Sequence, residues 1–398
     1  MIQTDAAAPA TRRPPVHLAG APRMAIVHEW LVTPAGSEAV LQELVHLFPQ
    51  ADRFCVIDGL TDEHRARLGV GHPRTTWLQY VPGAARFYRA LLPLMPHAIE
   101  RLDLSAYDLI LSNSHAVAKG VRPRPGALHL CHCCSPVRYA WDLRERYLAE
   151  AGVARGPAGW AVRAMLEWLR RWDLGATDRV GAFIAISGFI ADRIRRAYGR
   201  DSVVVYPPVD IDYFTPDPAI PRGTHYLAAS RLVGYKRMPA IVEAFRSLPD
   251  RELVIIGDGP DRRRVRDAAG PNVTVLGHQP RERLRHEMRR ARAFLFAAEE
   301  DFGIAPVEAL ACGTPVIALG HGGACETVTP ATGAFFNEAT PEAIAAAIRQ
   351  FEAHPTPAPE ACRANAERFS VERFHREIAA VVTATWDAHR SGKTHAPR

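Results

Sequence analysis

Two carboxylates, Glu300 and Glu308, stand eight residues apart in the segment EEDFGIAPVEALACGTPVIA, residues 299–318. Phe302-Gly303 lies between them, and a glycine lets its backbone approach a ligand closely. Glu300 comes directly after AFLFAAE and is expected to end that strand, and Glu308 lies one turn into a helix that starts near Pro306. The two carboxylates could therefore accept hydrogen bonds from different parts of one polyhydroxylated ligand.

Two cations follow another apolar run, THYLAAS, in the loop SRLVGYKR. They are Arg231 and Lys236, and lysine occurs at only three positions of this chain, so Lys236 is conspicuous. A helix start with unpaired N–H groups and two nearby cations can bind a diphosphate. A solvated basic loop is the alternative. Together with the two carboxylates, the pattern favours a nucleotide-sugar site.

Two other motifs are weaker. The turn GDGP carries Gly257 and Gly259, but the third glycine of a dinucleotide fingerprint is replaced by Arg262. The sequence DID at 210–212 imitates a metal-binding pair of aspartates, but it lies in a proline-rich linker, where a structural role is the better interpretation. We therefore predict neither a nicotinamide site nor a metal site.

The apolar pattern predicts an α/β protein of two doubly wound parallel-sheet domains that face each other across a cleft. Short apolar runs such as MAIVHEW (24–30), YDLILSNS, ALHLCHC and GAFIAIS read as strands, and 37–48 reads as a helix. The rhythm breaks at YPPVDIDYFTPDPAIPRG (206–223) and then restarts with THYLAAS, ELVIIGDGP, VTVLGH, AFLFAAE and TPVIALG.

The predicted organisation has four parts. Residues 1–22 read as a disordered tail, 23–207 as an N-terminal acceptor-binding domain, 208–369 as a C-terminal nucleotide-sugar domain, and 370–398 as a helix that packs back on the first domain before a tail. A chain of 398 residues with net charge +6, no apolar stretch of membrane-spanning length and no nucleic-acid motif is expected to stay in the cytoplasm.

Three of the seven cysteines crowd into LHLCHCCSP as Cys131, Cys133 and Cys134, around His132. A zinc site usually needs a second ligand pair elsewhere, and none is present in the sequence. Buried thiols on a strand are the favoured interpretation, and reduced cysteines fit the cytoplasm.

The segments quoted above resemble the family 4 retaining glycosyltransferases, which have the GT-B fold. EEDFGIAPVEALACGTPVIA looks like the family's paired-glutamate segment, and SRLVGYKR, IIGDGP, ISGFIADRI and YPPVDIDYF match further segments in the same order. AIVHEWLVTPAGSEAVLQELVHLFP and YDLILSNSHAVAKGV resemble a bacterial branch, including mannosyltransferases of the WbaZ type, that builds O-antigen and exopolysaccharide repeats. The resemblance covers roughly residues 24–390.

The resemblance implies roles for individual residues. Glu300 and the backbone at Phe302, Gly303 and Ile304 would hold the donor sugar, and Glu308 would bind the ribose. Other implied donor contacts are the diphosphate cations Arg231 and Lys236, the Gly257 and Gly259 turn, the Gly277-His278 turn against the base, and Gly36 under the diphosphate, with Ser37 in place of the family's second glycine.

One departure concerns the residue that faces the reacting sugar. Relatives commonly carry His-Thr-Pro where this chain has Cys134-Ser135-Pro136. A thiol donates only weak hydrogen bonds, so the role of the family histidine falls to Cys134 or to His132, which shares the same strand face. A packed strand residue is the alternative for His132.

The implied activity is retaining, metal-independent hexosyl transfer that needs a nucleotide-sugar co-substrate and no other cofactor. GDP-mannose is the first choice of donor, with a UDP-sugar such as UDP-glucose as the alternative. A nucleotide-sugar epimerase and a non-catalytic sugar-binding protein stay open, whereas a phosphorylase would need a Schiff-base lysine for pyridoxal phosphate.

The implied acceptor is a polyprenyl-diphosphate-linked saccharide at the inner face of the bacterial inner membrane. The segment WLQYVPGAARFYRALLPLMP (77–96) combines aromatic residues with Arg86 and Arg89, which suits an anionic bilayer surface. Packing of this segment into the core is an equally good interpretation.

Overall fold

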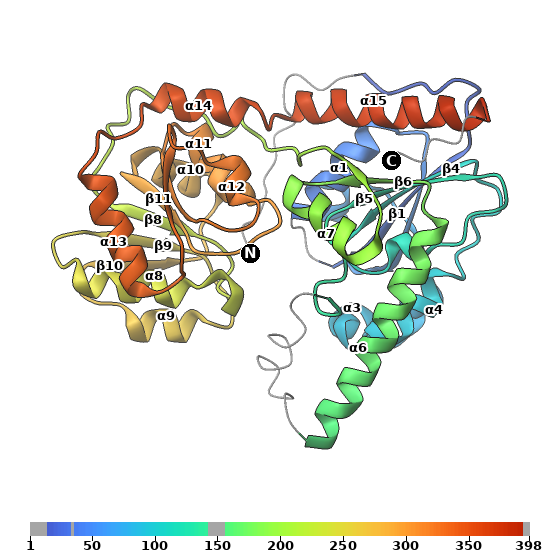
Figure 1. Cartoon of the computed structure of the whole chain (residues 1–398), viewed down its shortest axis with the longest axis horizontal. Coiled ribbons are helices and arrows are strands. Elements are labelled where there is room, and N and C mark those ends of the chain that lie inside the picture. The colour runs from blue at the N-terminus through green and yellow to red at the C-terminus, as the bar shows by residue number, and fades with distance from the viewer. Residues whose placement is uncertain (1–13, 33–35, 142–155, 393–398) are drawn as a thin grey trace. The chain divides into compact units, whose positions relative to one another are not determined.

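The computed structural model describes residues 14–32, 36–141 and 156–392 (Figure 1). These residues form two compact units that divide between Tyr206 and Pro207, and the chain returns to the first unit at His375. We refer to them as the N-terminal unit and the C-terminal unit, and each is described by itself.

The N-terminal unit is built on a seven-stranded parallel sheet with the order β3-β2-β1-β4-β5-β6-β7. The strand order reverses between β1 and β4, which is the switch point at which ligands bind in doubly wound folds. The strands are β1 (Met24–Leu31), β2 (Asp52–Asp58), β3 (Arg74–Thr75), β4 (Leu109–Ser114), β5 (Leu128–Cys133), β6 (Ala182–Ala185) and β7 (Ser202–Val204).

Helices and short 3-10 turns connect these strands. They are α1 (Gly36–Leu47), α2 (Asp62–Leu68), η1 (Trp77–Tyr80), α3 (Ala84–Phe87), η2 (Tyr88–Leu94), α4 (Met95–Ile99), η3 (Ala118–Gly120), α6 (Gly156–Ala176), η4 (Thr177–Arg179) and α7 (Gly188–Tyr198). Local sequence fixes several of the ends. For α7, the Ser187 hydroxyl accepts from the Ile190 N–H at 3.1 Å, and Gly199 ends the helix in the left-handed conformation.

The C-terminal unit repeats the architecture with a six-stranded parallel sheet in the order β10-β9-β8-β11-β12-β13. Its switch point lies between β8 and β11. The strands are β8 (Tyr226–Ala229), β9 (Leu253–Ile256), β10 (Val273–Gly277), β11 (Ala293–Phe296), β12 (Val316–Leu319) and β13 (Gly333–Phe336). The helices are η5 (Gly234–Lys236), α8 (Met238–Ala244), η6 (Phe245–Ser247), α9 (Arg262–Ala268), α10 (Arg281–Arg290), α11 (Ile304–Ala311), α12 (Ala324–Thr327), α13 (Pro341–Glu352) and α14 (Pro359–Glu367).

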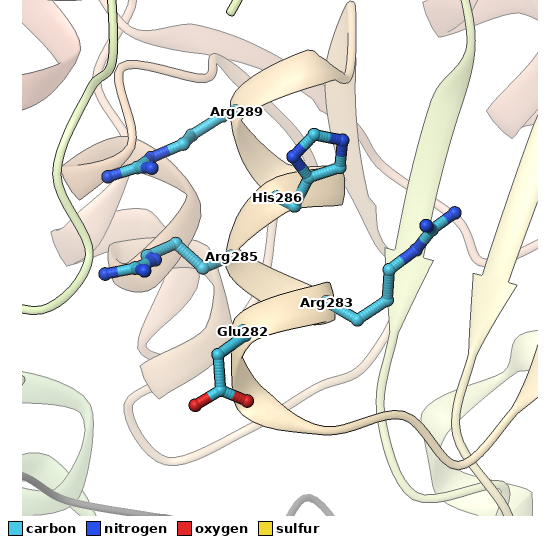
Figure 2. A pocket seen from close by; sticks show the side chains of 5 residues that line it. All are labelled: Glu282, Arg283, Arg285, His286 and Arg289. Carbon is cyan, nitrogen blue, oxygen red and sulfur yellow. The ribbon is translucent and has the colours of Figure 1, made fainter.

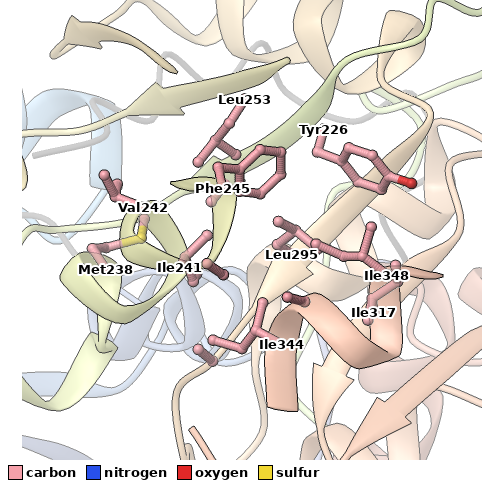
Figure 3. Close-up of a cluster of buried hydrophobic side chains, with 14 of the residues drawn as sticks. Tyr226, Met238, Ile241, Val242, Phe245, Leu253, Leu295, Ile317, Ile344 and Ile348 are labelled. Atoms are coloured by element: carbon pink, nitrogen blue, oxygen red, sulfur yellow. The ribbon is translucent and has the colours of Figure 1, made fainter. Parts of the chain in front are cut away.

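Buried aliphatic side chains hold helices α8 and α13 against this sheet (Figure 3). Ile241 and Val242 of α8, Leu295 of β11 and Ile344 of α13 all belong to this cluster, and each is almost fully removed from water. This cluster covers one face of the sheet, and the alternate strand residues Leu227, Phe294 and Val316, which point to the other face, are also buried. Burial on both faces explains why the strand sequences are continuous apolar runs. The prediction of two doubly wound parallel-sheet domains is confirmed.

The chain ends differ from their prediction in one respect. Residues 14–22 are not a disordered tail: Val16 N–H donates to the Leu47 carbonyl at 2.8 Å, and Leu18 is buried. Residues 1–13 lie outside the described part of the chain. The last helix, α15 (Val371–Arg390), crosses into the N-terminal unit, where its Trp386 indole donates to the Ala19 carbonyl at 2.8 Å.

Helix α10 binds the proline-rich linker to the C-terminal unit. Arg281 pairs with Asp210 at 2.7 Å, and Arg289 donates to the Thr215 carbonyl at 2.6 Å. Figure 2 shows Arg285 and Arg289 pointing to one side of the helix and Arg283 to the other. Together with Glu282 and His286, these side chains line a shallow pocket on α10. The Asp-x-Asp sequence of the linker therefore has the structural role that was predicted for it.

Candidate functional site

The switch point of the C-terminal unit brings Lys236 and Glu300 together. Lys236 ends the loop after β8, and Glu300 lies in the loop after β11, the neighbouring strand. The Lys236 ammonium forms an ion pair with Glu300 Oε1, and both side chains are mostly buried, with 14% and 18% of their surface exposed. Two residues that are 64 positions apart thus meet where a doubly wound sheet binds its ligand.

Aromatic rings surround the Lys236 ammonium. It lies 5.4 Å from the centre of the Tyr235 ring and 5.7 Å from the centre of the Phe296 ring. Arg231, from the same loop, is exposed. The Glu300 carboxylate offsets part of the Lys236 charge, so this loop attracts an anionic ligand through Lys236 together with the exposed Arg231.

The loop from Glu300 to Gly303 differs from its prediction at its start. Strand β11 ends at Phe296, so Glu300 does not end the strand but follows it by four residues. Helix α11 begins at Ile304, two residues before Pro306, because Gly303 turns the chain in the left-handed region at φ 89°. Gly323 N–H donates to the Glu300 carbonyl at 2.8 Å and fixes the loop from β12.

Glu308 is the second carboxylate of the opening pattern and lies on α11, one turn after Ile304. Burial raises the pKa of the Glu308 carboxyl to about 7; the positive charge of Arg281 opposes this rise, and the negative charge of Asp210 adds to it. Glu308 is therefore a carboxyl group whose charge changes near neutral pH, in a position where a ligand hydroxyl could hydrogen-bond to it.

We expect Glu308→Gln to stabilise the fold near pH 8 and to leave it almost unchanged below about pH 5. A carboxyl with a raised folded-state pKa contributes stability below its unfolded value of 4.5 and loses it as pH rises through about 7. The loss amounts to at most about 3 kcal/mol. Urea unfolding at the two pH values measures it, with the exposed Glu252→Gln as the control. Equal unfolding free energies of wild type and Glu308→Gln near pH 8 would contradict the raised pKa.

Gly257 and Gly259 have a packing reason to be glycine. A Cβ atom on Gly257 would lie 1.8 Å from the Ser230 carbonyl oxygen, and one on Gly259 would lie 2.4 Å from that of Leu232. These glycines therefore let the loop that carries Arg231 lie directly on the turn after β9. The backbone N–H of Gly257 also donates to the Gly277 carbonyl at 2.8 Å.

Two further residues that were predicted to contact the donor, His278 and Phe302, differ in how far their side chains are exposed to solvent. His278 is exposed after β10, as a group that contacts a base would have to be. The Phe302 side chain is 3% exposed and packs edge-on against the Phe369 ring at 5.3 Å. The predicted ligand contact of Phe302 is made by its backbone, and its side chain packs in the core.

In the N-terminal unit, strand register aligns three polar side chains at the switch point. His28 of β1 is the partner of Asn113 on β4, and Asn113 is the partner of His132 on β5. In adjacent parallel strands, residues in register point to the same face of the sheet. Cys134, two residues beyond His132, joins the row, and its Sγ lies 3.2 Å from Asn113 Oδ1. Gly36 and Ser37 begin α1, and Asn113 Nδ2 donates to the Ser37 carbonyl at 2.9 Å.

His132 is fully buried, and burial lowers the pKa of its imidazole to about 4. The ring is therefore neutral at pH 7 and would act as a hydrogen-bonding group, not as a cation. The sequence interpretation brought out His132 and Cys134 but missed Asn113 and His28. A signal was present, since both are polar residues within the predicted buried strands MAIVHEW and YDLILSNS, where apolar side chains are expected.

The cysteine cluster divides across the sheet. Cys131 and Cys133 are fully buried in β5 and alternate with His132 and Cys134 along the chain, so the two pairs point to opposite faces. No group of three or more His, Cys, Asp or Glu residues in the described ranges 14–32, 36–141 and 156–392 is arranged to hold a metal ion. The thiols on the strand are buried, as the favoured interpretation predicted.

Comparison with known proteins shows which protein families and which fold this chain resembles. Residues 34–213 match the family model described as Glycosyltransferase Family 4, and residues 219–369 match the model described as Glycosyl transferases group 1. Two successive regions of the chain are therefore each similar to a glycosyltransferase domain. Its fold, two parallel-sheet Rossmann-like domains, is GT-B: HepE of Anabaena, solved with UDP, aligns with a TM-score of 0.68 at 18% identity, over 91% of this chain and 100% of that one.

Two curated relatives are more similar in sequence. A GDP-mannose-dependent monoacylated alpha-(1-6)-phosphatidylinositol monomannoside mannosyltransferase of Corynebacterium glutamicum is 33% identical over 37% of this chain and 46% of its own length. A GDP-mannose-dependent alpha-(1-6)-phosphatidylinositol dimannoside mannosyltransferase of Mycobacterium tuberculosis is 29% identical over 53% of this chain and 60% of its own. The chain spans about half the length of the curated relatives it matches.

Proposed function

We propose that this protein is a retaining, metal-independent hexosyltransferase that moves mannose from GDP-mannose to a polyprenyl-diphosphate-linked saccharide, in the synthesis of an exopolysaccharide or O-antigen repeat. The observation that carries the proposal is the pairing of Lys236 with Glu300 at the β8/β11 switch point, in the domain that matches Glycosyl transferases group 1. The names of the two mannosyltransferase relatives support GDP-mannose as the donor. The WbaZ-type branch is the part of the proposal that rests on the resemblance of 25–49 and 107–121.

The proposed chemistry assigns a separate task to each charged group. Arg231 and Lys236 stabilise the negative charge that grows on the departing diphosphate. The acceptor hydroxyl attacks from the face of the sugar that the diphosphate leaves, and a leaving phosphate oxygen takes its proton. Glu300 is already neutralised by Lys236, which suits a group that positions sugar hydroxyls better than a nucleophile. Glu308 binds the ribose.

The donor is tested by ligand-induced stabilisation of the purified chain in EDTA. GDP-mannose should raise the melting temperature more than GDP-glucose, UDP-glucose or UDP-N-acetylglucosamine, because a ligand that binds only the folded state stabilises it by mass action. Transfer of radiolabelled mannose to a polyprenyl-diphosphate saccharide should then follow without added metal. Preferential stabilisation by a UDP-sugar would overturn the choice of base, and stabilisation by none would overturn the function.

The acceptor places the protein at a membrane surface, and one segment is suited to that role. Within residues 77–94, Trp77, Tyr80, Phe87 and Leu94 are 40%, 84%, 55% and 46% exposed. The same segment buries Leu78 and Ala84 in the core, so both sequence interpretations apply to different faces. Residues 64–99 contain no Asp or Glu, and the exposed Arg86 and Arg89 lie among the aromatic side chains. No helix in the described ranges is long and apolar enough to cross a bilayer.

We expect Arg86→Gln/Arg89→Gln to bind vesicles containing phosphatidylglycerol about 30-fold more weakly than wild type. Each arginine near an anionic surface contributes about 1 kcal/mol, and about 2 kcal/mol corresponds to this factor. Co-sedimentation at two salt concentrations measures the effect, which should shrink at high salt. Val203→Ser, which alters an exposed apolar side chain on β7, is the control. Unchanged binding of the double arginine variant would contradict the assignment of this surface.

A further inference from the structure

Asn113 makes four hydrogen bonds at the switch point of the N-terminal unit. Its Nδ2 donates to the Ser37 carbonyl at 2.9 Å and lies 3.2 Å from His28 Nδ1. Its Oδ1 lies 2.9 Å from His132 Nδ1 and 3.2 Å from the Cys134 Sγ. An amide has two donor hydrogens and two acceptor lone pairs, so these contacts use the full capacity of the Asn113 side chain. The residue is completely buried.

The Ser37 carbonyl settles which end of the amide is which. A carbonyl oxygen can only accept, so the amide nitrogen must face it and the amide oxygen must face β5. His28 Nδ1 then accepts the second amide hydrogen, and His28 Nε2 carries its proton toward Glu38 Oε1, 3.5 Å away. On the other side, His132 Nδ1 and the Cys134 thiol must both donate to Asn113 Oδ1.

This arrangement determines the state of both residues that could face the reacting sugar. His132 is held as the tautomer protonated on Nδ1, which makes its Nε2 an acceptor. Cys134 is held as a thiol whose hydrogen is already directed at Asn113. The same amide holds the Ser37 carbonyl at the start of α1, the loop proposed to lie under the donor diphosphate. One side chain thus links the two groups of residues that the proposed reaction needs in this unit.

We propose that Asn113 is a positioning residue of the transfer reaction, which fixes the His132 tautomer and the Cys134 thiol and ties both to the Ser37 backbone. The inference rests on the proposed function for the reaction itself, but the hydrogen-bond network can be tested without it. It also assigns the role left open between His132 and Cys134: His132 presents an acceptor, and Cys134 directs its thiol hydrogen to Asn113.

The first test uses the wild-type protein alone. Nitrogen-15 NMR of histidine-labelled protein, with His132→Gln for assignment, should show His132 neutral and protonated on Nδ1 at neutral pH. Within the network, Asn113 and Cys134 contact this ring, whereas His28 contacts Asn113 and Glu38 contacts His28. A His132 ring protonated on Nε2 would overturn the proposal, whatever the protein transfers. If no nucleotide sugar binds, the proposed function fails while this measurement still decides the network.

The second test compares two substitutions that differ in what they keep. Asn113→Asp retains an acceptor for His132 but has no hydrogen to donate to Ser37, and Asn113→Leu removes both interactions. We expect turnover per folded molecule to fall by about 10-fold or more in each, the scale of a buried group left unpaired, with a smaller change in the donor KM. In Asn113→Asp the new carboxylate should also raise the His132 pKa and add an ionisation to the pH–rate profile.

Asn272 provides the matched control. It lies in the C-terminal unit, where its Nδ2 donates to the carbonyls of Phe245, Leu248 and Arg251 at 2.8–3.1 Å. Asn272→Asp should lower the melting temperature but keep wild-type turnover per folded molecule and the wild-type pH profile. If the Asn113 variants also lost only stability, Asn113 would be a structural residue and the proposal would be wrong.

Discussion

Lys236→Ala should weaken binding of GDP by about 1.5–3 kcal/mol, the scale of one charged hydrogen bond. Turnover should fall further, because negative charge on the diphosphate is greatest in the transition state. Arg231→Ala should behave in the same way, and Arg263→Ala, which removes an exposed cation of α9, should not. Calorimetric binding and transfer kinetics provide the measurements. Near-wild-type transfer by the Lys236→Ala/Arg231→Ala double variant would contradict the diphosphate assignment.

The ion pair with Glu300 makes this prediction more specific. Removing Lys236 leaves the partly buried Glu300 carboxylate without its cation, and that negative charge would then repel the diphosphate. Adding Glu300→Gln to Lys236→Ala should therefore restore part of the lost GDP binding. Glu300→Gln alone releases Lys236 from its partner, so it should keep or tighten GDP binding while losing transfer activity. Additive effects of the two substitutions would contradict this coupling.

Much of the fold could be predicted from the sequence, because both sheets are covered on both faces. Fully buried parallel strands appear as continuous apolar runs between turn residues, which is how 24–30 and 293–296 were found. Strands β2, β3, β7 and β13 were not predicted. In β2 (DRFCVID) two charged residues precede the apolar run, and β3 has only two residues. β7 and β13 lie at the edges of their sheets and are mostly not buried. Strand order could not be predicted, since apolar pattern does not specify a neighbour.

The site was predicted only as far as local sequence determines it. The cations and carboxylates at the ends of β8 and β11 were found because polar residues follow apolar runs there. Their direct contact depends on the pairing of β8 with β11, which brings together residues far apart in the chain. The Asn113 network depends in the same way on the register of three strands, β1, β4 and β5. Residues 14–22 were mispredicted because Ala, Pro and Arg composition does not reveal that Val16 hydrogen-bonds to α1.

A second lysine, Lys119, has a structural role in the N-terminal unit. Its ammonium forms an ion pair with Asp173 of α6, and the two side chains are 1% and 0% exposed. The other carboxylate oxygen of Asp173 accepts from the Trp141 indole at 2.8 Å and from the Tyr198 hydroxyl at 2.7 Å. Burial alone would lower the pKa of Lys119, but Asp173 holds it above its usual 10.5. The pair thus ties η3, α6 and α7 together.

Asp173→Ala should destabilise the protein by about 3–5 kcal/mol, because it leaves a buried ammonium without a counter-charge. It also leaves the partly buried Trp141 donor and the buried Tyr198 donor without their acceptor. Asp173→Asn should cost less, since an amide oxygen can still accept one of these hydrogen bonds. The free energy of unfolding in urea near pH 7 measures each variant, with loss of the exposed Asp192–Arg195 pair in Asp192→Ala as the control.

The double variant Lys119→Met/Asp173→Leu distinguishes the cost of an unpaired buried charge from the cost of lost side-chain packing. Replacing a buried ion pair by apolar side chains of similar size is often neutral, because neither charge then has to be desolvated. We therefore expect the double variant to be more stable than Asp173→Ala alone, although it still lacks the acceptor for Trp141 and Tyr198. If Asp173→Ala cost less than about 1 kcal/mol, the scale of an exposed pair, the ammonium would have to reach water. The burial that assigns Lys119 a structural role would then be wrong.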